Sequence, residues 1–278
     1  MDVRRKAGHD ASMSISPDLA FVLTLLLRMA VTAGFVVTAS IVTERSGPVI
    51  GALVATLPVS TGPAYIFLAL DHDSAFIAES ALAALPVNAV TIVFGLTYAM
   101  LAQRRRMIVS FAVAMLVWLS LVIGVNDIAW SLAGGLAVNA LVCAVCLPLA
   151  QRYRKAVMPL IRRRWYDIPL RALLVAILVA TVISLSGRVG PVVTGALAIF
   201  PIVFSSLMLI LHPRIGGRAT AAVVANALWG LVGFGLGLAA LHLGALHVGS
   251  AVGLILGLAV CVCWNLGLWA FSRRGAVR

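Results

Sequence analysis

The sequence predicts an all-α integral membrane protein of about nine transmembrane helices, in which two four-helix repeats of opposite orientation flank one additional helix. Hydrophobic residues make up 62% of the chain and charged residues 11%, and the mean hydropathy is +1.09. Apolar runs long enough to cross a hydrocarbon core of ~30 Å recur along the whole length. The runs are continuous, without the alternation of a membrane barrel, so helices are expected. A third observation, an internal repeat, predicts the 4+1+4 arrangement.

The repeated motif consists of an arginine, a second arginine that opens Arg-x-Gly-Pro, and a further proline. In the first half these residues are Arg28, Arg45, Gly47, Pro48 and Pro58. Each recurs 143 residues later, as Arg171, Arg188, Gly190, Pro191 and Pro201. Duplication on this scale in an apolar chain is typical of membrane carriers.

The elements follow from the apolar runs. Residues 1–17 are polar and expected to be disordered. Residues 18–125 form repeat 1, with spans at about 19–42, 47–70, 75–102 and 107–125. Residues 126–167 hold a linker helix, at about 128–150, and a basic loop. Residues 168–278 form repeat 2, with spans at about 168–186, 190–211, 219–243 and 248–271, and a basic turn at 212–218.

The loop charges predict the orientation. The net charge of +12 is concentrated in short loops, which indicates contact with anionic lipid head groups and not with nucleic acid. Placing Arg104–Arg106 inside puts the 151–167 loop and the C-terminus inside as well. The N-terminus then lies outside, and the expected location is a bacterial cytoplasmic membrane. In the alternative, 47–70 is a re-entrant loop and the N-terminus is inside, but span seven would then behave differently from its copy.

Pro58 and Pro201 mark the predicted substrate site. Each lies inside a span and frees backbone groups at membrane depth, and broken helices paired across a repeat indicate the binding site of a carrier. Ser60, Thr61 and Ser205 follow the two prolines and supply hydroxyl groups. The alternative is that both prolines are ordinary kinks in packed helices.

Four other residues are candidates on chemical grounds. Arg28 would imply an anionic substrate if it faced a cavity, although it is also placed to snorkel at the end of a short span. Asn88 and Asn226 would line a cavity or, as is common in spans, join helices by hydrogen bonds. Glu79 is the acidic candidate for proton coupling.

Enzymatic motifs are missing from the sequence. It contains no nucleophile elbow, His-Glu-x-x-His helix, phosphate loop or paired carboxylates. All four cysteines lie in apolar runs without nearby metal-ligating partners. We therefore expect neither an enzyme nor a bound metal or cofactor.

Each half resembles the small four-span bacterial membrane proteins of the GlpM type. The similarity lies in Ile50-Gly51-Ala52-Leu53-Val54 leading to Pro58, then the aromatic run Tyr65-Ile66-Phe67 and a polar turn. It covers spans one to three and, more weakly, six to eight. The resemblance implies a fused duplication of a dual-topology ancestor and carries no specific activity.

Together these features predict a small secondary transporter or exporter. Its substrate would be a small anionic or envelope-precursor molecule, bound where the two broken helices cross. The alternative is a non-transporting membrane scaffold or accessory subunit of an envelope complex. A homodimer is compatible with either function.

Overall fold

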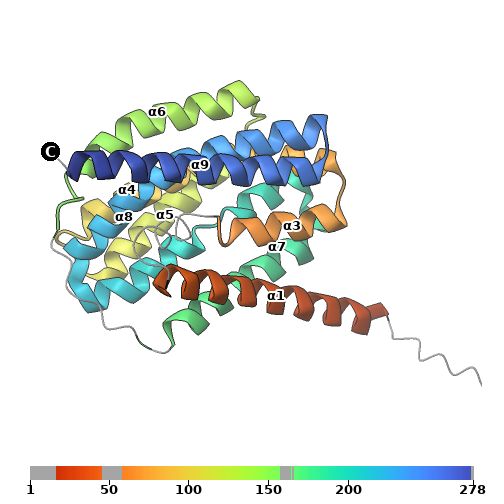
Figure 1. Ribbon diagram of the computed structural model, residues 1–278, viewed down its shortest axis with the longest axis horizontal. Helices are drawn as coiled ribbons and strands as arrows, with labels where there is room; N and C mark the ends of the chain where they lie inside the picture. Colours follow the sequence, from red (N-terminus) through yellow and green to blue (C-terminus); the bar gives the residue numbers. More distant parts are fainter. Residues whose placement is uncertain (1–16, 46–57, 157–163, 165, 277–278) are drawn as a thin grey trace, which may run out of the picture.

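The computed structural model describes residues 17–45, 58–156, 164 and 166–276, and these residues form helices and no strand (Figure 1). Seven of the described helices are long and apolar enough to cross a membrane. The chain is therefore an all-α membrane protein. The N-terminal tail predicted to be disordered, the first Gly-Pro motif at 47–48 and most of the basic loop after 156 lie outside the described residues.

The helices follow the apolar runs closely in the first half and less closely in the second. Their bounds are α1 Pro17–Arg45, α3 Thr61–Asp71, α4 Ser74–Leu101, α5 Met107–Asn126, α6 Leu132–Gln151, α7 Asp167–Ala198, α8 Ile202–His247 and α9 Ser250–Ala276.

Helix α4 lies at the centre of the bundle. In the most apolar stretch of α4, 72% of the residues are buried. The corresponding share is 17% in α5 and 22% in both α6 and α9. It packs most extensively on α8, in the antiparallel direction. Near its start Ala78 accepts a hydrogen bond from His242, late in α8, and near its end Gly95 contacts Leu228. Helices α5, α6 and α9 pack around this pair, so α4 is mostly buried while these outer helices expose most of their surface.

Helices α1 and α7 form a second antiparallel pair at the edge of the bundle (Figure 1). Val36 of α1 belongs to the same buried cluster as Val175, Val179 and Val182 of α7. Because these small branched side chains recur every three to four residues, they form one face of a helix and allow close packing.

Two turns predicted between spans are instead single glycine kinks. Gly190 has φ 74° within α7, and Gly216 has φ 80° within α8. Helix continues on both sides of Gly216, so the predicted turn over residues 212–218 is confined to this one non-helical residue. Glycine adopts a positive φ without steric cost, so one residue redirects the helix without a loop.

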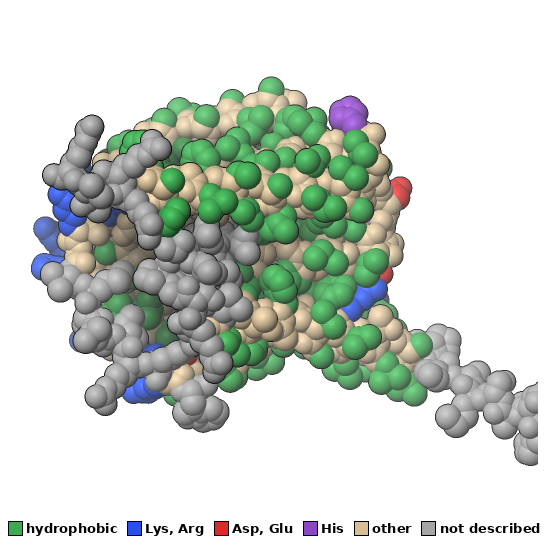
Figure 2. Space-filling view, viewed as in Figure 1, with side chains coloured by type: hydrophobic (Ala, Val, Ile, Leu, Met, Phe, Trp, Pro, Cys, Tyr) green, Lys and Arg blue, Asp and Glu red, His purple; other side chains and the backbone are tan. Residues whose placement is uncertain are grey.

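The outer surface is apolar between two charged ends. Figure 2 shows hydrophobic side chains across the middle of the molecule, with most of the visible lysines and arginines at its left end. Exposed apolar residues are numerous on α5 and α9, including Ile108, Leu116, Ile123, Ile255 and Phe271. An apolar band of this kind is what a lipid environment stabilises.

Candidate functional site

The break between α7 and α8 is formed by residues 199–201. Helix α7 ends at Ala198, and the Phe200 amide donates to Leu197 at 3.0 Å in a final tight turn. Pro201 then precedes the first residue of α8, and its carbonyl accepts from the Ser205 amide at 2.8 Å. A proline has no N–H to continue the preceding helix but is well suited to begin the next one.

The non-helical segment Pro58–Ser60 precedes α3 and is called the second break here, although the residues before it lie outside the described part of the chain. The Pro58 carbonyl accepts a hydrogen bond from the Gly62 amide at 2.7 Å, and Ser60 is the N-cap residue of α3. The first helical residue, Thr61, donates its hydroxyl proton to the Ala198 carbonyl at 3.2 Å. That carbonyl is one of the last in α7, where the helix itself supplies no partner. The hydroxyl at one break thus satisfies a backbone group at the other.

One cavity of about 170 Å³ lies where the two breaks meet. Pro58 and Pro201 both line it, together with Ser60 and Thr61. The other lining residues come from both breaks, α4 and α8, and they are Val59, Thr91, Ile199, Phe200, Val203, Phe204, Leu207, Ala227, Gly230, Leu231 and Phe234. Pro58 and Pro201, which are far apart in the sequence, thus lie at the wall of one cavity.

The polar character of this cavity comes from hydroxyl groups and helix ends. Ser60, Thr61 and Thr91 supply the hydroxyls, and the described lining contains no ionisable side chain. Helices α3 and α8 both begin at its wall, and a helix N-terminus carries a partial positive charge. The arrangement favours a hydrogen-bond acceptor, and it offers no general acid or base.

The other polar candidates serve helix packing away from this cavity. Asn88 is fully buried and donates to Asn139 at 2.8 Å and to the Leu231 carbonyl at 3.0 Å. Asn226 accepts from Arg154 at 2.6 Å. Ser205 is 5% exposed, does not line the cavity, and its hydroxyl has no hydrogen-bond partner among the described residues.

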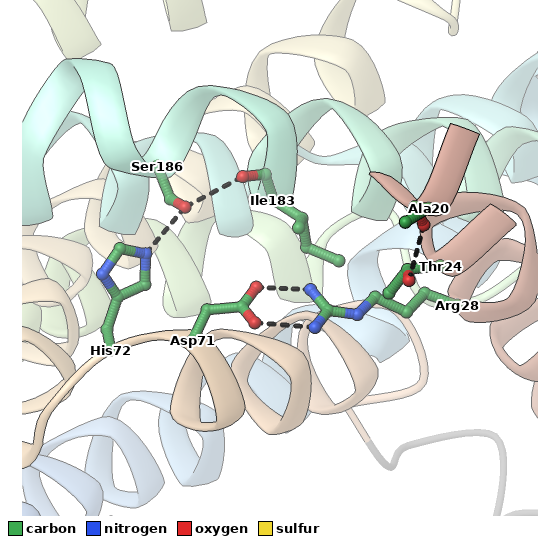
Figure 3. A network of polar contacts seen from close by, with 7 residues as sticks. All are labelled: Ala20, Thr24, Arg28, Asp71, His72, Ile183 and Ser186. Atoms are coloured by element: carbon green, nitrogen blue, oxygen red, sulfur yellow. Dashed lines mark hydrogen bonds and ion pairs between the residues drawn. The ribbon is translucent and has the colours of Figure 1, made fainter. Parts of the chain in front are cut away.

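Arg28 is bound within the protein. Both of its terminal nitrogens donate to the carboxylate of Asp71 at the end of α3, and its guanidinium lies 5.6 Å from the centre of the Phe67 ring (Figure 3). Beside this pair, Ser186 of α7 donates to the Ile183 carbonyl, so its oxygen accepts from His72 at 2.8 Å. The network ties α1 and α7 to one end of α3.

A second ion pair ties α7 to α8. Arg214 donates to both carboxylate oxygens of Asp167, each at 2.6 Å, and its guanidinium lies 5.6 Å from the Tyr166 ring centre. A hydrogen bond from Arg164 lowers the pKa of the Tyr166 hydroxyl, and Arg214 acts in the same direction. Glu79, the proposed coupling residue, is exposed on α4 and lines none of these sites.

Comparison with protein-family models, with curated proteins and with solved structures finds no match. The similarity to GlpM-type proteins therefore stays a prediction. Within the described residues, no cluster of three or more His, Cys, Asp or Glu side chains could hold a metal ion.

Thr91, Phe200 and Phe234 are cavity residues that the sequence analysis missed. Thr91 lies one helical turn after Asn88, donates to the Val87 carbonyl and accepts from the Trp118 indole at 3.1 Å. A polar residue one turn from another on an apolar helix is a usable signal, because the two share a face. The two phenylalanines gave no such signal, since apolar residues are everywhere in this chain.

Proposed function

We propose that this protein is a small secondary carrier of a bacterial cytoplasmic membrane. Its substrate site is the cavity at the crossing of the two helix breaks. The observation that carries the proposal is the hydrogen bond from Thr61 to Ala198 at the wall of a cavity shared by Pro58 and Pro201. Irregular backbone at membrane depth is stable only where other protein groups or a water-filled cavity satisfy it.

An inverted repeat accounts for the pairing of helices. Aligning Phe94-Gly95-Leu96 with Phe234-Gly235-Leu236 relates α4 to the second part of α8 by an offset of 140 residues. Gly95 packs against Leu228, and Gly235 packs against Asn88, which is the position equivalent to Leu228. A pair of contacts exchanged in this way is expected of two units related by a two-fold axis.

The two ion pairs also support a repeat relation between the two halves, but the signs of their charges are exchanged. Arg214 occupies the position 143 residues after Asp71, and Asp167 lies one helical turn before Arg171, the equivalent of Arg28. In each half, a charged residue on the first helix thus binds one near the end of the broken segment, with the signs exchanged. An ion pair thus joins α1 to the end of α3 in the first half and α7 to the first part of α8 in the second half.

The proposed orientation has the N-terminus outside and the C-terminus in the cytoplasm. Described basic residues cluster at one end of the bundle, around Arg104–Arg106 and Arg152–Lys155, and excess positive charge marks the cytoplasmic side. These residues would contact anionic lipid head groups. Reporter fusions after Asp127 and Arg105 should report outside and inside, respectively; the reverse pattern would refute this orientation.

The substrate that the cavity suits has a small group rich in hydrogen-bond acceptors. The Ser60 hydroxyl and the N-termini of α3 and α8 offer a hydrogen-bond donor and partial positive charge, since the hydroxyl protons of Thr61 and Thr91 are already donated to backbone carbonyls. A carboxylate, phosphate or sugar hydroxyl group fits this lining. Arg28 and Glu79 do not line the cavity, so neither carries the proposed recognition.

Single-cysteine accessibility tests the site. In a cysteine-free background, Val59→Cys, Ser60→Cys and Val203→Cys should react with a small, membrane-impermeant thiol reagent, because the cavity must connect to water for a carrier to load. Asp73→Cys is the reactive control in a polar turn. Leu141→Cys, 65% exposed on the apolar face of α6, is the unreactive control.

The alternative function is a membrane scaffold or accessory subunit. It predicts a dry bundle, in which the three cavity cysteines stay unreactive while Asp73→Cys reacts fully. That result would overturn the carrier proposal. Reaction at the cavity in either monomeric or homodimeric protein supports it.

A further inference from the structure

A larger cavity of about 670 Å³ adjoins the substrate cavity. It lies between α1, α3, α8 and α9, and its wall is almost entirely apolar. The hydroxyls of its two threonines are occupied, since Thr32 donates to the Arg28 carbonyl at 2.8 Å and Thr61 to Ala198. A volume of this size is within the range of cavities that bind organic ligands, and the lining selects an apolar one.

The two cavities share part of their walls. Pro58, Thr61 and Phe234 line both the larger and the smaller one. The hydroxyl groups of Ser60 and Thr91 belong to the smaller cavity alone. A molecule that occupied both would therefore meet an apolar wall along most of its length and hydroxyl groups at one end.

The larger cavity opens toward lipid. Phe35 of α1, Ile66 of α3 and Ile255 of α9 line it and are also 48%, 51% and 67% exposed on the outer surface. Phe35 and Ile255 lie on helices long and apolar enough to cross a membrane, and Ile66 lies on the shorter helix α3. Entry between α1 and α9 thus comes from the bilayer.

We propose that the substrate is a single-chain amphiphile taken from the bilayer. Its apolar chain occupies the larger cavity, and its acceptor-rich head lies at the two helix breaks beside the Ser60 hydroxyl and the N-termini of α3 and α8. This inference rests on the proposed carrier function and names the substrate class of that site. Chain and head are recognised separately, so neither a free head group nor a plain hydrocarbon satisfies both cavities.

Photo-crosslinking in phosphatidylcholine nanodiscs tests the inference with the full-length protein. The probe is dodecyl phosphate with a diazirine on its terminal carbon, and mass spectrometry locates the adducts. We expect adducts on Phe35, Ile66 and Leu258, which line the cavity. Unmodified dodecyl phosphate should compete for these adducts, whereas inorganic phosphate and dodecane should not.

Two substitutions on α9 provide a matched pair. Leu258 lines the larger cavity and is 48% exposed, while Leu256 is 43% exposed and does not line it. Leu258→Trp fills the cavity and should lower the adduct yield on α1 and α3 roughly tenfold, the change expected from losing a few buried methylene contacts. Leu256→Trp should leave the yield unchanged.

Four outcomes would overturn the inference. Adducts spread evenly over the apolar face, including Ile108 and Leu141, would show ordinary annular lipid. If the two tryptophan variants changed the adduct yield equally, the larger cavity would not be the binding site of the chain. Competition by inorganic phosphate alone would indicate that the substrate is a soluble anion. Competition by dioleoyl phosphatidic acid but not by dodecyl phosphate would indicate a lipid with two chains. The cysteine assay uses no amphiphile, so a reactive small cavity with any of these results leaves the carrier proposal standing.

Discussion

Replacing Gly195 with alanine should be among the most destabilising single-methyl changes in the protein. A Cβ atom at Gly195, in the last part of α7, would lie 2.2 Å from the Ser80 carbonyl oxygen and 2.9 Å from its carbon. Because both are backbone atoms of α4, the collision can be relieved only by separating the helices. Ser80 also donates to the Pro191 carbonyl at 3.0 Å, and separation weakens that bond.

The magnitude follows from two opposing effects. Overpacking of a close contact costs typically 1–3 kcal/mol, and a weakened hydrogen bond within a membrane adds about 0.6 kcal/mol. Alanine recovers about 1 kcal/mol of helix propensity. The expected net loss of unfolding free energy is about 0.6–2.6 kcal/mol.

Gly187→Ala is the matched control, since it makes the same change in the same helix. Nothing lies within 4 Å of a Cβ atom at Gly187, so only the propensity gain applies, up to about 1 kcal/mol. Unfolding in mixed micelles by increasing SDS fraction measures both variants. A Gly195→Ala protein within about 0.5 kcal/mol of the parent, or equal destabilisation by Gly187→Ala, would refute the close contact.

Three further predictions concern polar groups. Thr61→Val should cost about 1–2 kcal/mol in the SDS assay by leaving a carbonyl unpaired, while Thr181→Val, whose exposed hydroxyl bonds within its own helix, should cost less than about 0.5 kcal/mol; equal costs would contradict the link between the two breaks. Arg28→Gln and Asp71→Asn should be non-additive by about 0.5–2 kcal/mol in a double-mutant cycle, and additive effects would show that the ion pair contributes nothing. Tyr65→Phe should leave the melting temperature unchanged or raise it, because the buried hydroxyl has no partner among the described residues; a lower melting temperature would reveal one.

The sequence predicted the helical class and the break at Pro201 for clear physical reasons. Apolar length determines which segments enter a membrane, and proline prevents continuation of a helix at a defined residue. The residues before Pro58 lie outside the described part of the chain, so a broken helix there stays a prediction, as does a substrate site at the two prolines. Gly190 directly precedes Pro191 in the repeated motif and Gly216 lies in the predicted basic turn, so both positive-φ glycines fall where the sequence predicted a boundary between spans. The sequence did not indicate that helix would resume within one residue of each glycine.

The roles of the polar residues could not be predicted, because the sequence of an apolar helix does not indicate which face lines a cavity. Asn88 and Thr91 lie one turn apart on α4, yet the first binds neighbouring helices and the second lines the cavity. Arg28 was ambiguous until its partner was known, and that partner lies 43 residues away in the chain. Distances of this kind depend on tertiary packing and not on local pattern.

The buried asparagine pair has a consequence for biosynthesis. Asn139 of α6 donates to the Leu85 carbonyl and accepts from Asn88, so these bonds are available as soon as α4 and α6 are in the membrane. The bond from Asn88 to Leu231 has to wait until the ribosome has made α8, 92 residues after Asn139. The two asparagines thus fix the register of α4 against α6 first, and Asn88 forms its bond to α8 later. The helices therefore assemble in the order in which they are synthesised. Exchanging that order by circular permutation would leave a buried amide waiting for its partner in hydrocarbon, where an unsatisfied polar group is most costly.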